Sequence, residues 1–175
     1  LYKVSAGIAV FYASLRAPLF VKFMQERTQN IEVCPEILAL IKKSLAILVQ
    51  QYRIGCVIPI PSRTWNMRNK IAQFIADQLQ MPVLDCLCWN EVPISRQGEL
   101  LNNDQRSYNV NNKMTAKLRQ NIPKGAILLL DDYMGSGATI KEAARVLRKK
   151  LKTTQKIVPF TLAAIKWRLG KRGMI

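Results

Sequence analysis

Histidine is absent from this 175-residue chain, which removes the commonest general base and metal ligand of proteins. A Ser-His-Asp or Cys-His catalytic site is therefore excluded within the chain. Acidic residues are scarce, with 11 Asp and Glu against 27 Lys and Arg, and the net charge is +16. This excess makes nucleic acid or a polyphosphate ligand a candidate partner, and a merely solvated basic surface is the alternative.

Cysteine is also scarce, and its spacing indicates no metal site. The four cysteines are Cys34, Cys56, Cys86 and Cys88, and no two of them form a C-x-x-C pair. Cys56, Cys86 and Cys88 lie in apolar, strand-like segments. We therefore expect buried, reduced thiols rather than zinc ligands or disulfides.

No hydrophobic run is long enough for a transmembrane helix. Residues 4–15 are apolar but too short to span a bilayer, and we interpret them as a strand or a buried opening segment. We expect a soluble, cytoplasmic protein. Its hydrophobic content of 49% is that of a globular chain, and its length is that of one domain.

Apolar periodicity predicts alternating strands and helices. Helices are expected at 18–27, 35–52, 66–80 and 140–151, and strands at 54–60, 81–89, 126–130 and 156–165. This alternation predicts an α/β fold with a doubly wound, mainly parallel sheet. We divide the single domain 1–175 into a helical and strand part (1–53), a core (54–165) and a basic tail (166–175), in which Trp167 either contacts a ligand or packs its indole.

The stretch 126–139 combines the features of a ligand site. Five apolar residues are followed by Asp131 and Asp132, then by a Gly-Ser-Gly-Ala-Thr turn and a helix. Ligands of open α/β sheets bind beyond the carboxyl ends of strands, where the turn and the helix start offer N–H groups to a phosphate. The two carboxylates are expected where the strand ends, to accept hydrogen bonds from ribose hydroxyls or to hold a metal indirectly. The alternative is that one Asp caps the helix.

The phosphate-binding motifs GxxxxGK[ST] and GxGxxG are both absent from the chain, so the phosphate cradle must be of another type. Residues 128–139, Leu-Leu-Leu-Asp-Asp-Tyr-Met-Gly-Ser-Gly-Ala-Thr, resemble the signature of the type I phosphoribosyltransferases. The resemblance implies that fold and binding of phosphoribosyl pyrophosphate. It makes Asp131 and Asp132 the catalytic acidic pair that contacts the ribose, and assigns the 5-phosphate to the loop residues Gly135, Ser136, Gly137, Ala138 and Thr139.

Two further segments are similar to the ComF-type branch of this family, and a similar domain is fused to some RecQ-type helicases. The first is Ile58-Pro-Ile-Pro-Ser62, followed by Arg63 and Arg68. The resemblance implies that Ser62, Arg63 and Arg68 contact the pyrophosphate, because guanidinium groups match phosphate geometry; surface charge at a helix start is the alternative. The second segment supplies candidate contacts to substrate or DNA: Arg96, Gln97, Arg106 and Asn109.

The resemblance implies a glycosyltransferase-class enzyme that uses Mg²⁺ and transfers a phosphoribosyl group, as a homodimer in many relatives. The alternative is a non-catalytic ComF/RecQ-associated module that acts in DNA uptake, recombination or repair. Gly135 stands where some family enzymes carry an acidic residue that serves the acceptor base. The four-cysteine zinc module that usually opens ComF proteins is also missing. The sequence therefore shows no general base for an acceptor.

Overall fold

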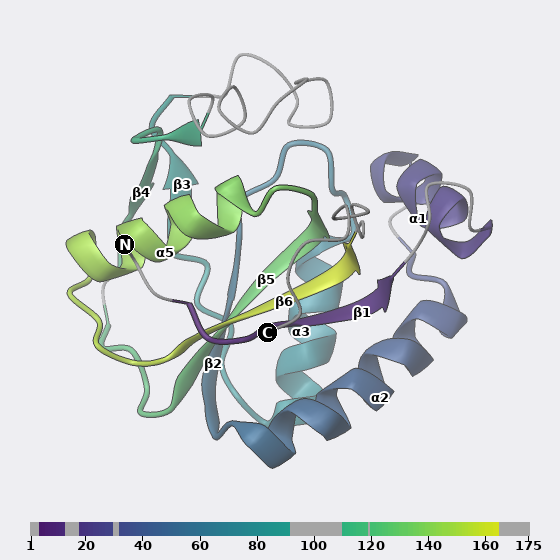
Figure 1. Cartoon of the computed structure of the whole chain (residues 1–175), viewed down its shortest axis with the longest axis horizontal. Helices are drawn as coiled ribbons and strands as arrows, with labels where there is room; N and C mark the ends of the chain where they lie inside the picture. The colour runs from purple at the N-terminus through teal and green to yellow at the C-terminus, as the bar shows by residue number, and fades with distance from the viewer. Residues whose placement is uncertain (1–3, 13–17, 30–31, 92–109, 119, 165–175) are drawn as a thin grey trace, which may run out of the picture.

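The structure is a computed structural model that describes residues 4–12, 18–29, 32–91, 110–118 and 120–164 (Figure 1). Arg96, Gln97, Arg106, Asn109 and Trp167 lie outside the described residues. The strands are β1 (Ile8–Tyr12), β2 (Ile54–Pro59), β3 (Leu87–Trp89), β4 (Met114–Ala116), β5 (Ala126–Met134) and β6 (Ile157–Ala164). The helices are α1 (Pro18–Gln29), α2 (Pro35–Gln51), α3 (Arg68–Leu79) and α5 (Ala138–Lys150).

Four strands form a parallel sheet in the order β1-β6-β5-β2, and β3 and β4 form a separate antiparallel pair. The prediction of an α/β fold with a mainly parallel sheet is therefore confirmed. The central strands β5 and β6 are apolar along most of their length because helices cover both faces of the sheet.

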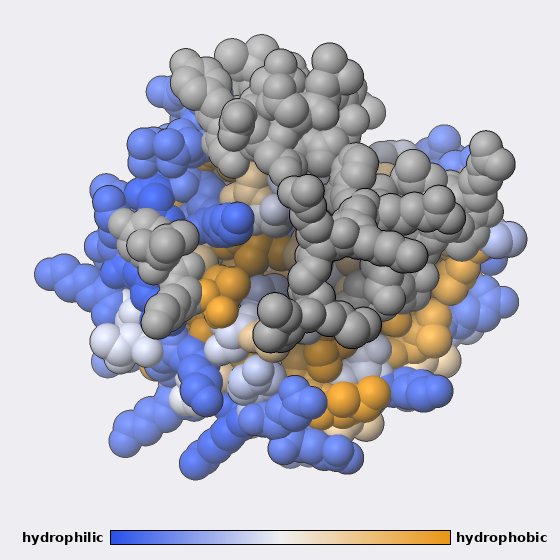
Figure 2. All heavy atoms as spheres, viewed as in Figure 1, coloured by the Kyte–Doolittle hydropathy of each residue, from blue (hydrophilic) through white to orange (hydrophobic). Residues whose placement is uncertain are grey.

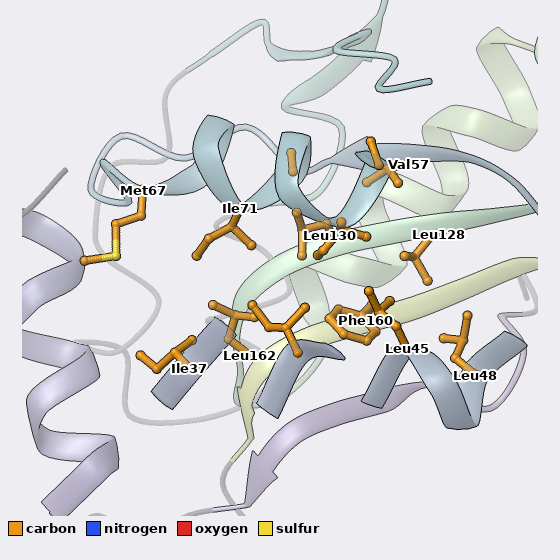
Figure 3. Close-up of a cluster of buried hydrophobic side chains, with 14 of the residues drawn as sticks. Ile37, Leu45, Leu48, Val57, Met67, Ile71, Leu128, Leu130, Phe160 and Leu162 are labelled. Carbon is orange, nitrogen blue, oxygen red and sulfur yellow. The ribbon is translucent and has the colours of Figure 1, made fainter. Parts of the chain in front are cut away.

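Alternate residues of the strands enter two separate cores. Leu128 and Leu130 of β5 pack with the helices α1, α2 and α3, whereas Ile127 and Leu129 pack with α5 and the β3–β4 pair. Figure 3 shows the first core, where side chains of α2 and α3 meet those of β2, β5 and β6 around Phe160.

Helix α2 illustrates how the sequence specifies these elements. It begins at Pro35, whose ring suits the first turn of a helix, and buries Ile37, Ile41, Leu45 and Leu48 along one side. Helix α3 ends where Gln80 adopts a left-handed conformation, with φ of 53°. The predicted helix positions therefore agree with the structure to within about two residues at most boundaries.

Two of the predicted strand ranges are wrong. The strand expected at 81–89 is limited to β3, which pairs antiparallel with β4, and Val83 forms an isolated parallel bridge with Val57. The second wrong range concerns the acidic pair. The strand β5 does not stop at Leu130 but continues through both aspartates to Met134. The continuation occurs because β6 extends beside it, pairing Asp131 with Thr161, Tyr133 with Ala163 and Met134 with Ala164. The carboxylates therefore lie within the last part of the strand rather than after it.

The expectation of buried thiols is confirmed for two of the four cysteines and is wrong for Cys34 and Cys88. Cys56 and Cys86 are buried, Cys34 and Cys88 are half-buried, and all four are free. Burial raises the pKa of Cys56 to about 12, with a smaller contribution from Cys86. In the described part of the chain, no helix combines the length and the apolar character that a membrane crossing needs.

Candidate functional site

The site lies where the carboxyl ends of β2 and β5 meet. Pro59 is the register partner of Leu130, and the N–H of Ile60 donates to the carbonyl of Leu130 at 2.8 Å. The loop that follows β2 therefore begins beside the last residues of β5. This pairing brings two distant segments to the same edge of the sheet. They are Ser62–Arg63 and Asp131–Asp132, which lie some seventy residues apart in the sequence.

Asp131 and Asp132 are both buried, each with 7% of its surface exposed. The Oδ1 atom of Asp131 accepts a hydrogen bond from the N–H of Asp132 at 3.0 Å. Burial raises the pKa of Asp131 well above its usual value, and the charge of Asp132 and a hydrogen bond between the two side chains raise it further. Arg27 opposes this shift only weakly. The pair is therefore suited to carry a single negative charge over two carboxyl groups.

Arg27 of α1 forms an ion pair with Asp132. The side chains of Arg27 and Asp132 are 19% and 10% exposed, so the pair is largely shielded from water. The Nε atom of Arg27 is buried and has no hydrogen-bond partner. Sequence reasoning missed Arg27, because the two residues are 105 positions apart and nothing in the helix pattern distinguishes this arginine from a surface one.

The loop after β5 leads directly into α5. Gly137 is the N-cap residue with φ of 74°, a left-handed conformation that glycine adopts without strain. The N–H of Ala138 makes a long contact of 3.4 Å with the Ser136 hydroxyl, and no side chain caps the helix. The first N–H groups of a helix have no partner within it. The start of α5 therefore presents backbone donors, and phosphate binding by the loop Gly135–Thr139 remains a prediction.

Ser62 and Arg63 lie in the loop after β2. The Ser62 hydroxyl accepts a hydrogen bond from the N–H of Thr64 at 3.3 Å, which shapes this turn. Arg63 is exposed. Trp89 steadies the loop from β3 by donating its indole N–H to the carbonyl of Pro61 at 3.1 Å. The role of Ser62 and Arg63 in binding pyrophosphate remains a prediction.

Arg68 differs from Arg63 because protein acceptors occupy its guanidinium group. Nε donates to the carbonyl of Ile60 at 2.8 Å, and one terminal nitrogen donates to the carbonyl of Pro59 at 3.1 Å. Both terminal nitrogens also contact the Asp85 carboxylate, and one contacts Asn69. A guanidinium has five N–H donors, and these contacts use all of them. Arg68 therefore holds the end of β2 in place, whereas a pyrophosphate contact would require it to give up one of these partners.

A buried ion pair attaches the small β3–β4 sheet to α5. Arg145 donates two hydrogen bonds of 2.7 Å to the buried carboxylate of Glu142. The same carboxylate receives a long contact of 3.4 Å from the N–H of Met114 in β4. Glu142 lies one turn beyond the start of α5, so this contact fixes β4 relative to the helix that carries the loop.

A groove of about 350 Å³ lies elsewhere, between the carboxyl ends of α2 and α3 and the start of β2. Its lining includes Tyr52, Arg53, Ile54 and Met81. Because Ile54 begins β2 and Pro59 ends it, this groove lies at the amino edge of the sheet, opposite the acidic pair. It is therefore not part of the candidate site.

No family model matches the chain, and no curated protein matches it. Several solved structures of phosphoribosyltransferases are similar in backbone. One is the adenine phosphoribosyltransferase of Trypanosoma brucei in complex with AMP, pyrophosphate and ribose-5-phosphate, at 13% identity over 91% of this chain and 88% of that one, with a TM-score of 0.46.

Two others are similar at the same identity of 13%. The match to the adenine phosphoribosyltransferase of Leishmania tarentolae covers 75% of this chain and 72% of that one, with a TM-score of 0.44. The match to a hypoxanthine phosphoribosyltransferase of Staphylococcus aureus covers 93% of this chain and 78% of that one, with a TM-score of 0.41. These likenesses describe the course of the backbone; the ComF branch remains a prediction.

Proposed function

We propose that the chain binds phosphoribosyl pyrophosphate or a nucleotide 5-phosphate at residues Asp131–Thr139. The observation that carries the proposal is the direct succession of a buried acidic pair and an uncapped helix start at one edge of the sheet. Carboxyl groups accept hydrogen bonds from vicinal hydroxyls, and a helix start attracts phosphate through its N–H groups and its dipole. A sugar phosphate has both kinds of group.

In this proposal, Asp131 and Asp132 contact the ribose hydroxyls, and the Gly135–Thr139 loop holds the 5-phosphate. Arg63 neutralises the pyrophosphate, since it is exposed beside the carboxyl end of β5. Arg68 takes a positioning role behind it, because its donors hold Pro59 and Ile60. The ribose hydroxyls compete with Arg27 for Asp132, so ligand binding is coupled to the position of α1.

Mg²⁺ is part of the proposal only together with the ligand. Among the residues that the structure describes, no group of three or more acidic or cysteine side chains could hold a metal ion. Asp131 and Asp132 would therefore hold the ion indirectly, through the ribose hydroxyls that they bind, and pyrophosphate and ribose oxygens would supply its ligands. When bound, the ion would neutralise the charge of the pyrophosphate.

The reaction that follows from such binding is transfer of the phosphoribosyl group. The bond between the anomeric carbon and the pyrophosphate breaks, and a nucleophile forms a new bond to that carbon. Arg63 favours this step by stabilising the negative charge that develops on the departing pyrophosphate. Gly135 offers no side chain to take a proton from an acceptor, so binding without transfer is the narrower form of the proposal.

Calorimetric titration of the chain with phosphoribosyl pyrophosphate and Mg²⁺ tests the proposal. We expect saturable binding that the double variant Asp131→Asn/Asp132→Asn loses. A matched control, Asp77→Asn/Glu91→Gln, removes two exposed carboxylates elsewhere and should bind as the parent does. Absence of binding to the intact chain, or unchanged binding by the first variant, would refute it. Circular dichroism of both variants checks that they are folded.

A second candidate function is the ComF/RecQ-associated module that acts on DNA without catalysis. The observation that favours it is the net charge of +16, which exceeds what a single sugar phosphate needs. A ligand screen with phosphoribosyl pyrophosphate, nucleoside monophosphates and single-stranded DNA separates the two functions. DNA binding without any binding of the small ligands would favour the module.

A further inference from the structure

Half of the net charge of +16 lies in residues 110–164. Residues 110–164 contain 11 lysines and arginines and only three acidic residues. Those three are Asp131, Asp132 and Glu142, and all of them are buried. Asp132 forms its ion pair with Arg27, and Glu142 with Arg145. The exposed surface of this segment therefore carries lysines with no exposed acidic residue of its own.

Residues 1–91 carry charges of both signs, with ten Lys and Arg and six Asp and Glu. Two exposed lysines have acidic partners there, Lys22 with Glu36 and Lys70 with Glu32. The exposed Lys42 and Lys43 of α2 add positive charge to this part as well. The excess of basic over acidic residues is nevertheless larger in residues 110–164, so the field is stronger around that segment.

Hydrogen bonds bring the lysine-bearing segments together at the amino edge of the sheet. The side chain of Gln155 donates to the carbonyls of Pro123 and Gly125, which joins the segment before β6 to the segment before β5. The N–H of Ile127 donates to the carbonyl of Lys156 at 2.8 Å. Helix α5 ends beside the first of these segments, because Arg148 donates to the carbonyl of Thr153 at 2.7 Å.

We call this surface the basic edge. Its exposed members are Lys124, Lys149, Lys150, Lys152 and Lys156. Figure 2 shows hydrophilic side chains crowding the rim of the molecule on the side where α5 ends and β5 and β6 begin. The acidic pair lies at the other end of the same strands, so the basic edge is separate from the candidate site.

Lys152 keeps a long side chain at a position where the backbone conformation favours glycine, as Gln80 does after α3. It follows the end of α5 with φ of 50°, in the left-handed region where helices commonly place glycine. A lysine in that conformation costs about 1 kcal/mol relative to glycine. The chain therefore keeps a lysine where a smaller residue would make the turn more stable.

We propose that the basic edge binds the phosphodiester backbone of a nucleic acid. Lysine ammonium groups on flexible stems bind phosphates as point charges and need no defined base sequence. An anionic membrane is the less suitable partner, because surface-binding helices add exposed apolar side chains to their lysines. The exposed large apolar residues of the described chain, Val4, Val21, Ile47 and Val49, all lie outside residues 110–164.

Fluorescence anisotropy of the full chain with labelled single-stranded and duplex DNA tests the proposal, over about 50 to 200 mM salt. We expect the double variant Lys150→Glu/Lys152→Glu to bind at least about tenfold more weakly. The slope of log K against log salt should fall by about two for duplex DNA, one for each lost phosphate contact. Binding of either form of DNA at the basic edge supports the proposal.

The matched control is Lys42→Glu/Lys43→Glu, which makes the same change of charge with two exposed lysines of α2. It should leave the affinity for DNA within about twofold of the parent. A third variant, Lys152→Gly, should bind DNA more weakly while it unfolds at a higher urea concentration, which separates binding from folding. Equal losses in the two double variants, or tight binding to phosphatidylserine vesicles without binding to DNA, would overturn the proposal. Calorimetry with phosphoribosyl pyrophosphate should be unaffected by all three variants.

Discussion

The charged side chains at the two edges of the parallel sheet differ in their exposure to water. At the carboxyl edge, Asp131, Asp132 and Arg27 are withdrawn from water and depend on one another. At the amino edge, Lys124, Lys150 and other lysines are exposed. Buried charges are costly to separate, whereas exposed charges contribute little to folding. The contrast indicates that the charges at the carboxyl edge affect the stability of the fold, whereas those at the amino edge contribute little to it.

The largest expected effect comes from separating the buried ion pair. Asp132→Ala leaves the Arg27 guanidinium largely buried without its counter-ion, which should destabilise the fold by on the order of 3 kcal/mol. Lys150→Ala at the amino edge should change stability by less than about 0.5 kcal/mol. Urea unfolding of both variants checks this difference. The double variant Arg27→Met/Asp132→Leu should regain most of the loss, and similar small effects of both single variants would contradict the contrast.

The two arginines beside the site should also behave differently. Arg68→Lys removes most of the hydrogen bonds at the end of β2 and should cost about 2 kcal/mol of stability. Arg63→Lys should leave stability nearly unchanged and weaken binding of phosphoribosyl pyrophosphate instead. Chemical unfolding and calorimetry on each variant separate these roles. If Arg68→Lys loses ligand affinity at unchanged stability, Arg68 belongs to the binding surface after all.

A smaller effect follows from the titration of Asp131. Its pKa is raised in the folded chain by burial and by Asp132, so the folded state holds the proton more tightly than the unfolded state. The free energy of unfolding therefore falls as pH rises from the unfolded-state pKa of Asp131, about 4, to its pKa in the folded state. Above the folded-state pKa this loss of stability stays constant. Asp131→Asn should be the more stable protein at neutral pH. Urea unfolding from pH 4 upward should show the difference growing with pH, and a constant difference would contradict it.

The smallest expected effect lies at the amino edge. The Lys156 ammonium lies 5.8 Å from the centre of the Tyr52 ring. Lys156→Met should cost about 0.5 kcal/mol or less, because an exposed cation–π contact is weak. The same variant should reduce the salt slope of DNA binding by about one. Unfolding curves and anisotropy measure the two quantities on one sample, and a large loss of stability would show that Lys156 has a structural role.

The parts of the chain that could be predicted from its sequence are those with local signals. The order strand, acidic pair, small-residue turn and helix within 126–151 is read from periodicity and turn chemistry over a short span. The parallel sheet followed from the alternation of elements. Both predictions depend on neighbours in the sequence, and the structure agrees with both, except that the acidic pair lies within the strand rather than after it.

The parts that failed depend on distant neighbours. The end of β5 was placed too early because the length of β6 beside it decides how far the ladder continues. The ion pair of Arg27 joins two elements that no local pattern relates. The hydrogen bonds of Arg68 to Asp85 and to the carbonyls of Pro59 and Ile60 could likewise not be inferred from its sequence position, and its contact with pyrophosphate remains a prediction. Tertiary contacts of this kind are not encoded in spacing along the chain.

Helix α5 links the two edges: the Gly135–Thr139 loop lies at its start, and the basic edge lies at its end, near Lys150. Its 13 residues span about 20 Å at 1.5 Å each. The Debye length at physiological ionic strength is about 8 Å, so two anions held at opposite ends of this helix would hardly repel each other through solvent. The two proposed ligands, a sugar phosphate and a nucleic acid, would thus bind simultaneously, each with nearly the affinity it would have alone.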